Sequence, residues 1–493
     1  MNTNSIWFDD APHAPSFTSL NSNIQTEVAI IGAGMHGLLA AYLLAKAGKK
    51  VVVFEKNTIA SGTTAYTTAF ISNYTDLGFA ELVKTAGNDA KTVWHACQSA
   101  VDLIEKIVQD EHIECEFRRL PLHVYATDTD GEKYLQKEQE CAGKIDVTTA
   151  LLPAENFSFT NFGALKINGL ATFHPLKFLY ALTEKISQMD VQIFEHTHVT
   201  KIETSSPALL QAGNFQVTAE NVIAATHTPV NSQLLFPILL SGHTTYVIAG
   251  TAKADSLPQG LCIDTQTPYH YLRVDSVNGK DRFVFGGEDV ATGKTHEDGN
   301  AFEKLESELR ERFRTDITVT HQWGGEVFDS LDGLPYIGRH PLHSNQFFGT
   351  GYSGDGLPYS TLSAMIETDL ILGQPNPYEK LFSPKRLSGW EHLITHGMEV
   401  GAQVIKQKFS PKPDREELGA DEGAVVQEQG KELAVYKDRH GKIHTFSAKC
   451  THEGCTVNWN KELKSWDCPC HGSRFAATGE VLSGPATKPL QTE

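Results

Sequence analysis

The chain has 493 residues, more than one hydrophobic core usually serves, so we expect two or three domains. Hydrophobic residues make up 40% of it and charged residues 21%, which is typical of a globular protein. A formal net charge of −18 disfavours nucleic acid and anionic lipid surfaces as partners. No apolar run approaches the roughly 18 residues that cross a bilayer, and the N-terminus lacks a basic, apolar leader. We therefore expect a cytoplasmic protein without a membrane span.

The first predicted element is a nucleotide-binding unit. Residues 27–31 form a strand that runs directly into the motif Gly32-Ala-Gly34-Met-His-Gly37, and an apolar segment with helical spacing follows. A second strand then ends at Glu55. Glycines in this pattern allow a tight turn and let a pyrophosphate approach the helix N-terminus, and the acid accepts hydrogen bonds from a ribose. The unit predicts binding of a dinucleotide but does not separate FAD from NAD.

The central part of the chain, about residues 80–330, mixes predicted helices and strands. Apolar residues recur at near-helical spacing over residues 81–109. The predicted strands are 191–203, 215–225, 244–251 and 282–287.

Two segments far from each other in the sequence indicate which of these dinucleotides is bound. One is a threonine-rich stretch after the second strand, and the other is a glycine-rich turn between a strand and a helix. With the glycine motif they resemble the D-amino-acid oxidase, glycine oxidase and sarcosine oxidase superfamily over roughly residues 20–375, and that resemblance implies FAD. The residues it assigns to FAD are Gly32, Gly34, Gly37, Glu55, Thr63, Thr64, Thr67, Thr68, Val199, Gly351, Gly354 and Gly356. Val199 matches the adenine position, although a strand valine with no such role fits it equally well.

Substrate-binding residues are less clearly marked. Arg273 and Tyr271 fall where superfamily members carry substrate-pocket residues on the sheet over the flavin. Arg273 would bind a carboxylate with two parallel hydrogen bonds and Tyr271 would orient it. The alternative is a surface arginine that packs on strand side chains. Tyr246 and His243 are weaker candidates, and His36 is expected to support the backbone near the pyrophosphate.

A composition change after Gly373 predicts a linker. Proline-rich and acidic stretches flank a helical segment over residues 387–408, in which His392 and His396 lie one turn apart. These histidines either bind a metal or face solvent or the domain interface, and we favour the second. We expect an oxidoreductase unit over residues 1–375, a bridging helix and linker over 376–415, and a further domain over 416–493.

The last predicted feature is a pair of cysteine and histidine half-sites, Cys450-Thr-His452 and Cys468-Pro-Cys470-His471. Such residues suit either structural zinc or an iron–sulfur cluster. Zinc half-sites usually read C-x2-C or H-x3-5-H, and neither half-site here has that form.

Over about eighty residues this region resembles a Rieske [2Fe-2S] domain. The resemblance implies Cys450, His452, Cys468 and His471 as cluster ligands and a disulfide between Cys455 and Cys470. Two neutral imidazole ligands raise the potential above that of an all-cysteine cluster. Ser473 matches a hydrogen-bond donor of respiratory Rieske proteins, whereas Phe475 replaces their donor tyrosine, so we expect a potential below theirs.

Together these features predict an α/β chain: a Rossmann-type FAD-binding domain with an interleaved antiparallel substrate sheet, then a small all-β Rieske domain. The expected function is an FAD-dependent dehydrogenase of a small amine or amino acid. Its electrons would pass one at a time to the cluster and on to an external acceptor protein or quinone-like carrier. The alternatives are an electron-transfer reductase that supplies a partner oxygenase, and a non-enzymatic redox sensor.

Overall fold

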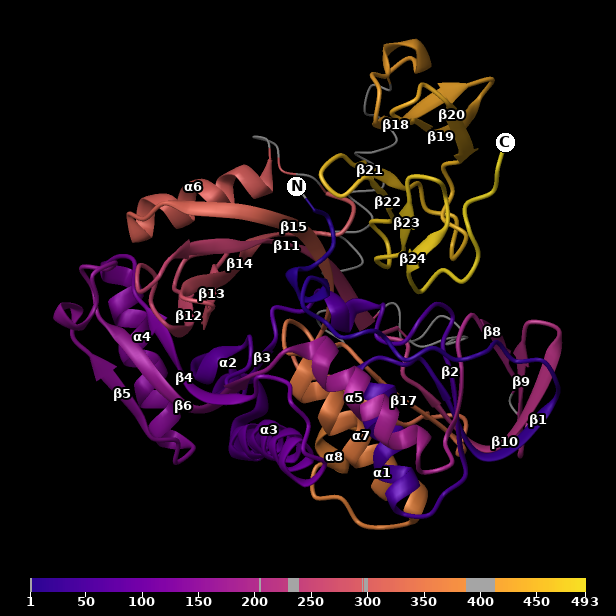
Figure 1. The fold of residues 1–493 in the computed structure, drawn as a ribbon, viewed down its shortest axis with the longest axis horizontal. Coiled ribbons are helices and arrows are strands. Elements are labelled where there is room, and N and C mark those ends of the chain that lie inside the picture. Colours follow the sequence, from indigo (N-terminus) through magenta and orange to yellow (C-terminus); the bar gives the residue numbers. More distant parts are fainter. Residues whose placement is uncertain (1, 204, 229–238, 295, 297–299, 387–412) are drawn as a thin grey trace.

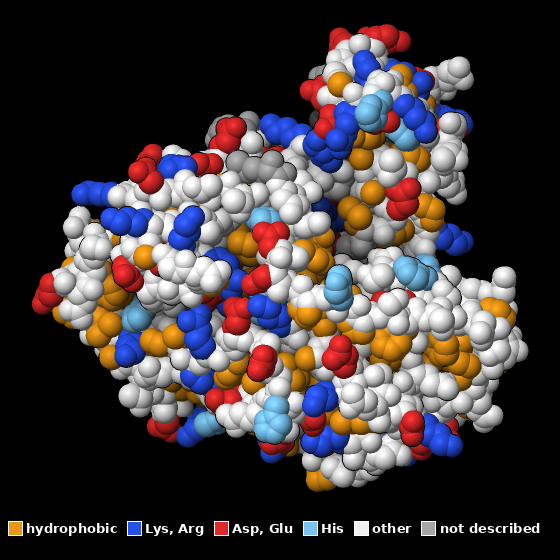
Figure 2. Space-filling view, viewed as in Figure 1, with side chains coloured by type: hydrophobic (Ala, Val, Ile, Leu, Met, Phe, Trp, Pro, Cys, Tyr) orange, Lys and Arg blue, Asp and Glu red, His pale blue; other side chains and the backbone are white. Residues whose placement is uncertain are grey.

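The computed structural model describes residues 2–203, 205–228, 239–294, 296, 300–386 and 413–493. Two mixed α/β layers form the larger body, and a small all-β lobe stands on it at the C-terminal end (Figure 1). Acidic, basic and hydrophobic side chains are interspersed over both parts (Figure 2). Among the described residues, no helix combines the length and apolar character needed to cross a bilayer.

The first sheet of the body is mainly parallel. Its strands in order are β16 (Tyr336–Arg339), β17 (Gln346–Thr350), β10 (Phe215–Ala224), β1 (Ile24–Ile31), β2 (Val51–Phe54) and β7 (Gln192–Phe194), and β8 (Val199–Ile202) with β9 (Ala208–Ala212) extends β10. The helices next to it are α1 (Met35–Lys46), α5 (Pro175–Ser187), α7 (Gly356–Leu372) and the short α8 (Glu379–Phe382). Strand β1 lies between β10 and β2, so the loop after β1 opens at the centre of the sheet.

Helix α1 can lie close to β1 because of two glycines. A Cβ atom on Gly37 would stand 2.0 Å from the carbonyl oxygen of Gly32, so no larger residue fits there. Most of α1 is buried, including Leu38, Leu39 and Ala40, which explains its nearly continuous apolar sequence.

The second sheet is mainly antiparallel and faces the first. Its strands in order are β15 (Ile317–Ser330), β11 (Leu240–Lys253), β14 (Lys280–Ala291), β13 (Tyr271–Val277), β12 (Gly260–Asp264), β4 (Arg118–Tyr125), β6 (Ala164–Thr172) and β3 (Phe70–Ile71), with β5 (Thr149–Leu152) beside β6. Its helices are α2 (Gly78–Ala86), α3 (Ala90–Asp110), α4 (Thr129–Lys144) and α6 (Ala301–Phe313). The chain crosses between the two sheets several times, which confirms the predicted interleaving.

The C-terminal lobe contains two small antiparallel sheets. One is β18 (Glu422–Glu428), β19 (Lys431–Lys437) and β20 (Ile443–Ser447), and the other is β21 (Asn458–Asn460), β22 (Ser465–Asp467), β23 (Arg474–Ala476) and β24 (Val481–Ser483). Trp466, Phe475 and Cys468 lie in one buried core of this lobe.

The predicted strands of the central region are confirmed within a few residues, but 191–203 divides into β7 and β8. The predicted helix over 81–109 is two helices, α2 and α3. They separate at Gly87, whose φ of +53° ends the first one. The predicted bridging helix, with His392 and His396, lies outside the described residues.

Candidate functional site

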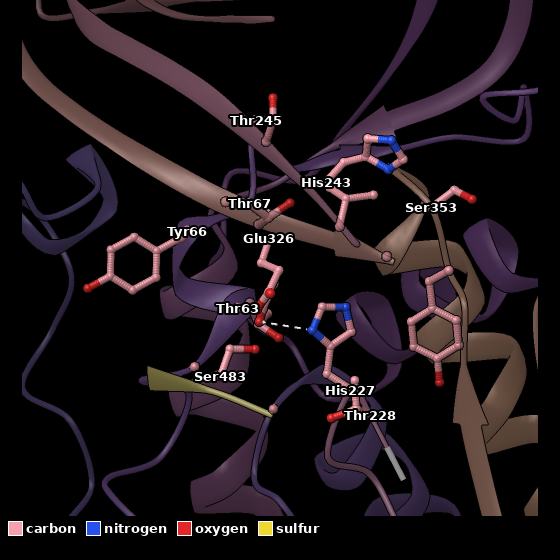
Figure 3. Close-up of a pocket in the computed structure, with 18 of the residues that line it drawn as sticks. Thr63, Tyr66, Thr67, His227, Thr228, His243, Thr245, Glu326, Ser353 and Ser483 are labelled. Atoms are coloured by element: carbon pink, nitrogen blue, oxygen red, sulfur yellow. Dashed lines mark hydrogen bonds between the residues drawn. The ribbon is translucent and has the colours of Figure 1, made fainter. Parts of the chain in front are cut away.

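A cavity of about 1800 Å³ opens between the two sheets and reaches the C-terminal lobe. The loop after β1, the threonine-rich stretch, the ends of β11, β14 and β15, and the start of α7 all contribute to its wall. Thr63, His227, Glu326 and Ser483 gather at one part of it, and His243 lies near Ser353 in another (Figure 3).

The glycine motif forms one end of this cavity. Gly32 has a φ of +104°, and Gly32 and Gly34 line the wall beside the N-terminus of α1. Glu55 lines the same wall, where Oε2 accepts a hydrogen bond from the Ala33 amide at 2.9 Å. The free amides of the helix N-terminus favour an anion here. The motif and the acid that the sequence analysis paired therefore meet at one place.

The threonine-rich stretch lies directly beside the motif. The Met35 amide donates to Thr64 Oγ1 at 3.3 Å, and a Cβ on Gly34 would approach that oxygen to 3.1 Å. All four threonines of the stretch and Val199 line the cavity. Thr63 Oγ1 lies 3.4 Å from Nδ1 of His227, a residue that follows the end of β10 and that the sequence analysis missed (Figure 3).

The glycine-rich turn divides into two parts. Gly354 and Gly356 line the cavity, whereas Gly351 does not. Gly351 has a φ of +72°, and a Cβ there would lie 3.1 Å from atoms of Leu240 and Ser330. It therefore shapes the turn rather than the cavity wall.

His36 lies within the motif, as expected, but its side chain has a different partner. Its Nε2 lies 2.7 Å from Glu367 Oε2 on α7, and both side chains are buried. Burial raises the pKa of Glu367. The contact ties α1 to α7, the two helices whose N-termini face the cavity.

The structure contradicts the expected role of Arg273. Its side chain is 1% exposed and does not line the cavity. Nε donates to Asp275 at 2.9 Å, Nη1 donates to the carbonyls of Ala69 and Phe173, and the guanidinium lies over the ring of Trp7. Arg273 therefore has structural partners, but it is buried in the core and not on the surface, where the alternative placed it.

Tyr271 does line the cavity. Its hydroxyl shares a hydrogen bond with Thr245 Oγ1 at 2.8 Å, and its ring covers Gly286. Tyr246 is turned away and accepts a hydrogen bond from Asn460 of the C-terminal lobe. His243 lines the cavity, and Asp329 at 2.9 Å raises its pKa. Any role of Tyr271 in orienting substrate stays a proposal.

The cavity wall also contains a group of acids that was not predicted from the sequence. These residues are Asp76, Asp289, Asp329 and Asp355. They come from four segments that are distant along the chain, so no local pattern could have joined them. Only Asp289, which follows the predicted strand 282–287, and Asp355, which lies within the glycine-rich turn, were next to predicted elements.

The two cysteine and histidine half-sites meet in the C-terminal lobe. The His452 and His471 ring centroids lie 5.1 Å apart, and Cys450 and Cys468 are 3% and 2% exposed. A hydrogen bond from Cys468 lowers the pKa of Cys450 to about 7, which favours the thiolate that binds metal. Cys455 and Cys470 form a disulfide between the two loops. Two thiols and two imidazoles converging in this way fit a [2Fe-2S] cluster.

The C-terminal lobe is fitted closely to the body. A Cβ on Gly472, next to His471, would lie 2.6 Å from the Phe328 ring, and one on Gly293 would lie 2.9 Å from the Pro469 nitrogen. The Phe328 ring is in turn 4.9 Å from that of His227. Residues 481–487 of the lobe line the same cavity as the glycine motif. The cysteine and histidine loop thus contacts the wall of the cavity that the glycine motif lines.

Comparison with known proteins agrees with these two sites. The FAD dependent oxidoreductase family model matches residues 27–370, and the Rieske [2Fe-2S] domain model matches residues 411–493. The chain belongs to the FAD-dependent oxidoreductase family, and it carries a C-terminal Rieske domain.

Particular relatives share one or both parts. The protein named "Putative Rieske 2Fe-2S iron-sulfur protein YhfW" of Bacillus subtilis is 31% identical over 491 residues, covering 97% of this chain and 95% of that protein. Gamma-glutamylputrescine oxidoreductase of Escherichia coli is 24% identical over 398 residues, 76% of this chain and 91% of that protein. Glycine oxidase from Geobacillus kaustophilus superposes with a TM-score of 0.63 at 19% identity, covering 74% of this chain and all of that one.

The cofactors of the chain are therefore FAD and a Rieske [2Fe-2S] cluster. The first supplies two-electron oxidation chemistry and the second accepts one electron at a time. The N-terminus of α1 and Glu55 would hold the first group, and Cys450, His452, Cys468 and His471 would hold the second.

Proposed function

We propose that the chain is a dehydrogenase that oxidises a small amine or amino acid in the FAD cavity and releases the electrons through the Rieske domain. The observation that carries the proposal is the contact between the two sites. Gly472, beside His471, packs against Phe328, and Phe328 packs against His227 in the cavity wall. A one-electron carrier held against a two-electron site serves electron export.

The class of substrate rests on the relatives. The names gamma-glutamylputrescine oxidoreductase and glycine oxidase both specify amino compounds. In the cavity, Tyr271 and Thr245 present hydroxyl groups from the sheet that faces the glycine-rich turn. Side chains that position a substrate are sufficient for oxidation, because the cofactor performs the chemistry.

The onward acceptor would be an external one-electron carrier, either a protein or a quinone-like molecule. His452 is half-buried on the loop opposite Gly472, and the adjoining Glu453 and Gly454 are exposed. This loop is the side of the cluster site that an acceptor would approach.

The test is anaerobic mixing of the purified protein with a panel of amines, amino acids and hydroxy acids. Bleaching of the flavin absorbance, followed by the electron paramagnetic resonance signal of a reduced Rieske cluster, is the expected result. In a Cys468→Ser control, the flavin should bleach without the cluster signal.

Other outcomes would favour the alternatives. Reduction by NADH alone would indicate a reductase that supplies a partner oxygenase. A flavin that no metabolite reduces, beside a cluster that titrates normally, would indicate a redox sensor.

A further inference from the structure

The part of the cavity below the substrate sheet is dominated by carboxylates. Asp289 and Asp329 lie at the ends of β14 and β15, Asp76 follows β3, and Asp355 precedes α7. We call these four residues and the wall around them the acidic recess. Elements from both sheets converge there, so the recess lies between the substrate sheet and the glycine-rich turn.

Hydrogen bonds hold Asp76 and Asp355 in place, and an ion pair holds Asp329. Tyr269 donates to Asp76 Oδ1 at 3.1 Å, and the Asp76 amide donates to Asp355 Oδ2 at 2.8 Å. His243 Nδ1 lies 2.9 Å from Asp329 Oδ2. Asp289 Oδ1 is buried and has no hydrogen-bond partner among the described residues.

The acids repel one another. Burial, with Asp329 and Asp289 nearby, raises the pKa of Asp76 to about 6. Burial and Asp76 raise the pKa of Asp355, and burial raises that of Asp289, with Asp329 adding to it. These acids raise one another's pKa values, and a bound cation would relieve the repulsion between them.

The lysines and arginines that line the cavity have partners or positions outside the acidic recess. Lys56 lies near Leu482 of the Rieske domain, and Lys84 pairs with Glu81 on α2. The others along the described wall come from the Rieske domain: Arg439, Lys464 and Arg474. Arg273, the one arginine expected here, is bound to Asp275 in the core. A substrate carboxylate would therefore meet four acids and His243.

Two further observations point to a ligand in the recess. Thr75, next to Asp76, lines the cavity and is only 4% exposed, yet its hydroxyl has no hydrogen-bond partner among the described residues. The rings of Tyr269, Tyr271 and Phe70 also line this part of the wall. Aromatic faces beside carboxylates are a favourable environment for alkylammonium groups.

We propose that the acidic recess binds the second positive charge of a diamine or a longer polyamine derivative. The carboxylates of Asp76, Asp289 and Asp329 hold the distal ammonium group, while the rings of Tyr269 and Tyr271 contact the alkyl chain. The inference rests on the proposed function and narrows its substrate class, since a compound with a free carboxylate lacks a cationic partner here.

The test measures binding to the holoprotein reduced with dithionite, so that no turnover occurs. Calorimetry with 1,4-diaminobutane, butylamine and 4-aminobutanoate compares a dication, a monocation and a zwitterion of similar length. We expect the dication to bind about tenfold or more tighter than the other two, because its second charge pairs with several carboxylates gathered in one cavity. Higher salt should reduce this preference.

Variants separate the recess from the rest of the wall. Asp329→Asn and Asp289→Asn should each remove most of the preference for the dication, and Asp329→Glu should retain it. Glu81→Gln is the matched control, since this exposed acid lies at the cavity rim and pairs with Lys84, and it should bind like the wild type. Circular dichroism and FAD content confirm that each variant is folded.

Equal affinity for the three compounds in the wild type, or tighter binding of 4-aminobutanoate, would overturn the inference. The outcome is separable from that of the proposed function. Selective binding of diamines without flavin reduction by any amine would leave the recess standing and refute the dehydrogenase. Flavin reduction by an amine whose affinity is unchanged in the aspartate variants would support the dehydrogenase and refute the role of the recess.

Discussion

The guanidinium group of Arg273 joins three segments of the body. It bonds to Asp275 within β13, to the carbonyl of Ala69 before β3 and to the carbonyl of Phe173 after β6. Asp275 also accepts from Arg118 and Arg282, so the cluster is a buried charge network under the substrate sheet. Removing one member leaves the remaining polar groups without their partners.

We expect Arg273→Met to destabilise the protein by about 3 kcal/mol or more, since it breaks a buried ion pair and frees two carbonyls. Denaturant unfolding measures this. The affinity for 1,4-diaminobutane should stay as in the wild type. A variant of normal stability that binds substrate poorly would return Arg273 to the substrate site.

Ser473 and Phe475 are the two residues expected to set the reduction potential of the cluster. A hydrogen bond from Ser473 contributes to the lowered pKa of Cys450, and Phe475 is fully buried in the same lobe. Donors to the sulfurs raise a cluster's potential. Ser473→Ala should therefore lower the potential and Phe475→Tyr should raise it. Voltammetry that finds both variants at the wild-type value would show that neither position acts on the cluster.

At the scale of elements, strand β15 lines the cavity and also contacts the Rieske domain. Gly324 contacts Leu463, Glu326 lies near Arg474 and Ser483, and Phe328 contacts Gly472. These alternate residues point toward the Rieske domain, as the two-residue period of a strand requires. Glu326 is 6% exposed, and its carboxylate makes no hydrogen bond among the residues that the structure describes.

Glu326 makes the free energy of unfolding depend on pH. Burial raises its pKa from 4.5 to about 8. Between these values the folded chain keeps a proton that the unfolded chain releases, so the free energy of unfolding falls as pH rises from about 4.5 to 8. Glu326→Gln removes this penalty and should stabilise the protein at pH 9 by up to roughly 4 kcal/mol, with little effect at pH 5. Calorimetric unfolding at both pH values is the measurement, and equal pH slopes in variant and wild type would contradict it.

The elements near the glycine motif were predictable because each signal is local. The strand, the turn and the helix from residue 27 onward follow from adjacent residues, as do the two cysteine and histidine loops. The helix break at Gly87 was missed because apolar spacing continues on both sides of it. The acidic recess was missed because its residues meet only through sheet topology, and Arg273 was misassigned because sequence does not reveal Trp7 and Asp275 around it.

At the scale of the whole molecule, the joint between the body and the Rieske domain depends on glycines. Gly293 has a φ of +82° and would press a Cβ against Pro469, whereas Gly279 has a φ of +73° and open space around it. Comparing these two glycines separates the effect of backbone strain, which both share, from the effect of the contact with Pro469, which only Gly293 has. Alanine at either position costs about 1 to 2 kcal/mol of strain.

We expect only Gly293→Ala to loosen the joint. Hydrogen exchange should rise in the loop from Cys468 to Ser473 for this variant and stay unchanged for Gly279→Ala. Similar exchange in both variants would mean that the close approach at Pro469 does not hold the Rieske domain in place.

The alternation along β15 also limits how this protein can evolve. The strand carries the wall of the substrate cavity and the seat of the Rieske domain within fourteen residues. An insertion or deletion of one residue would exchange the two faces, so substitutions are tolerated there while changes of length are not. A lineage that acquires a new substrate through β15 must do so without losing the fit at Gly324 and Phe328. The shape of the cavity and the fit of the Rieske domain are therefore coupled through one strand.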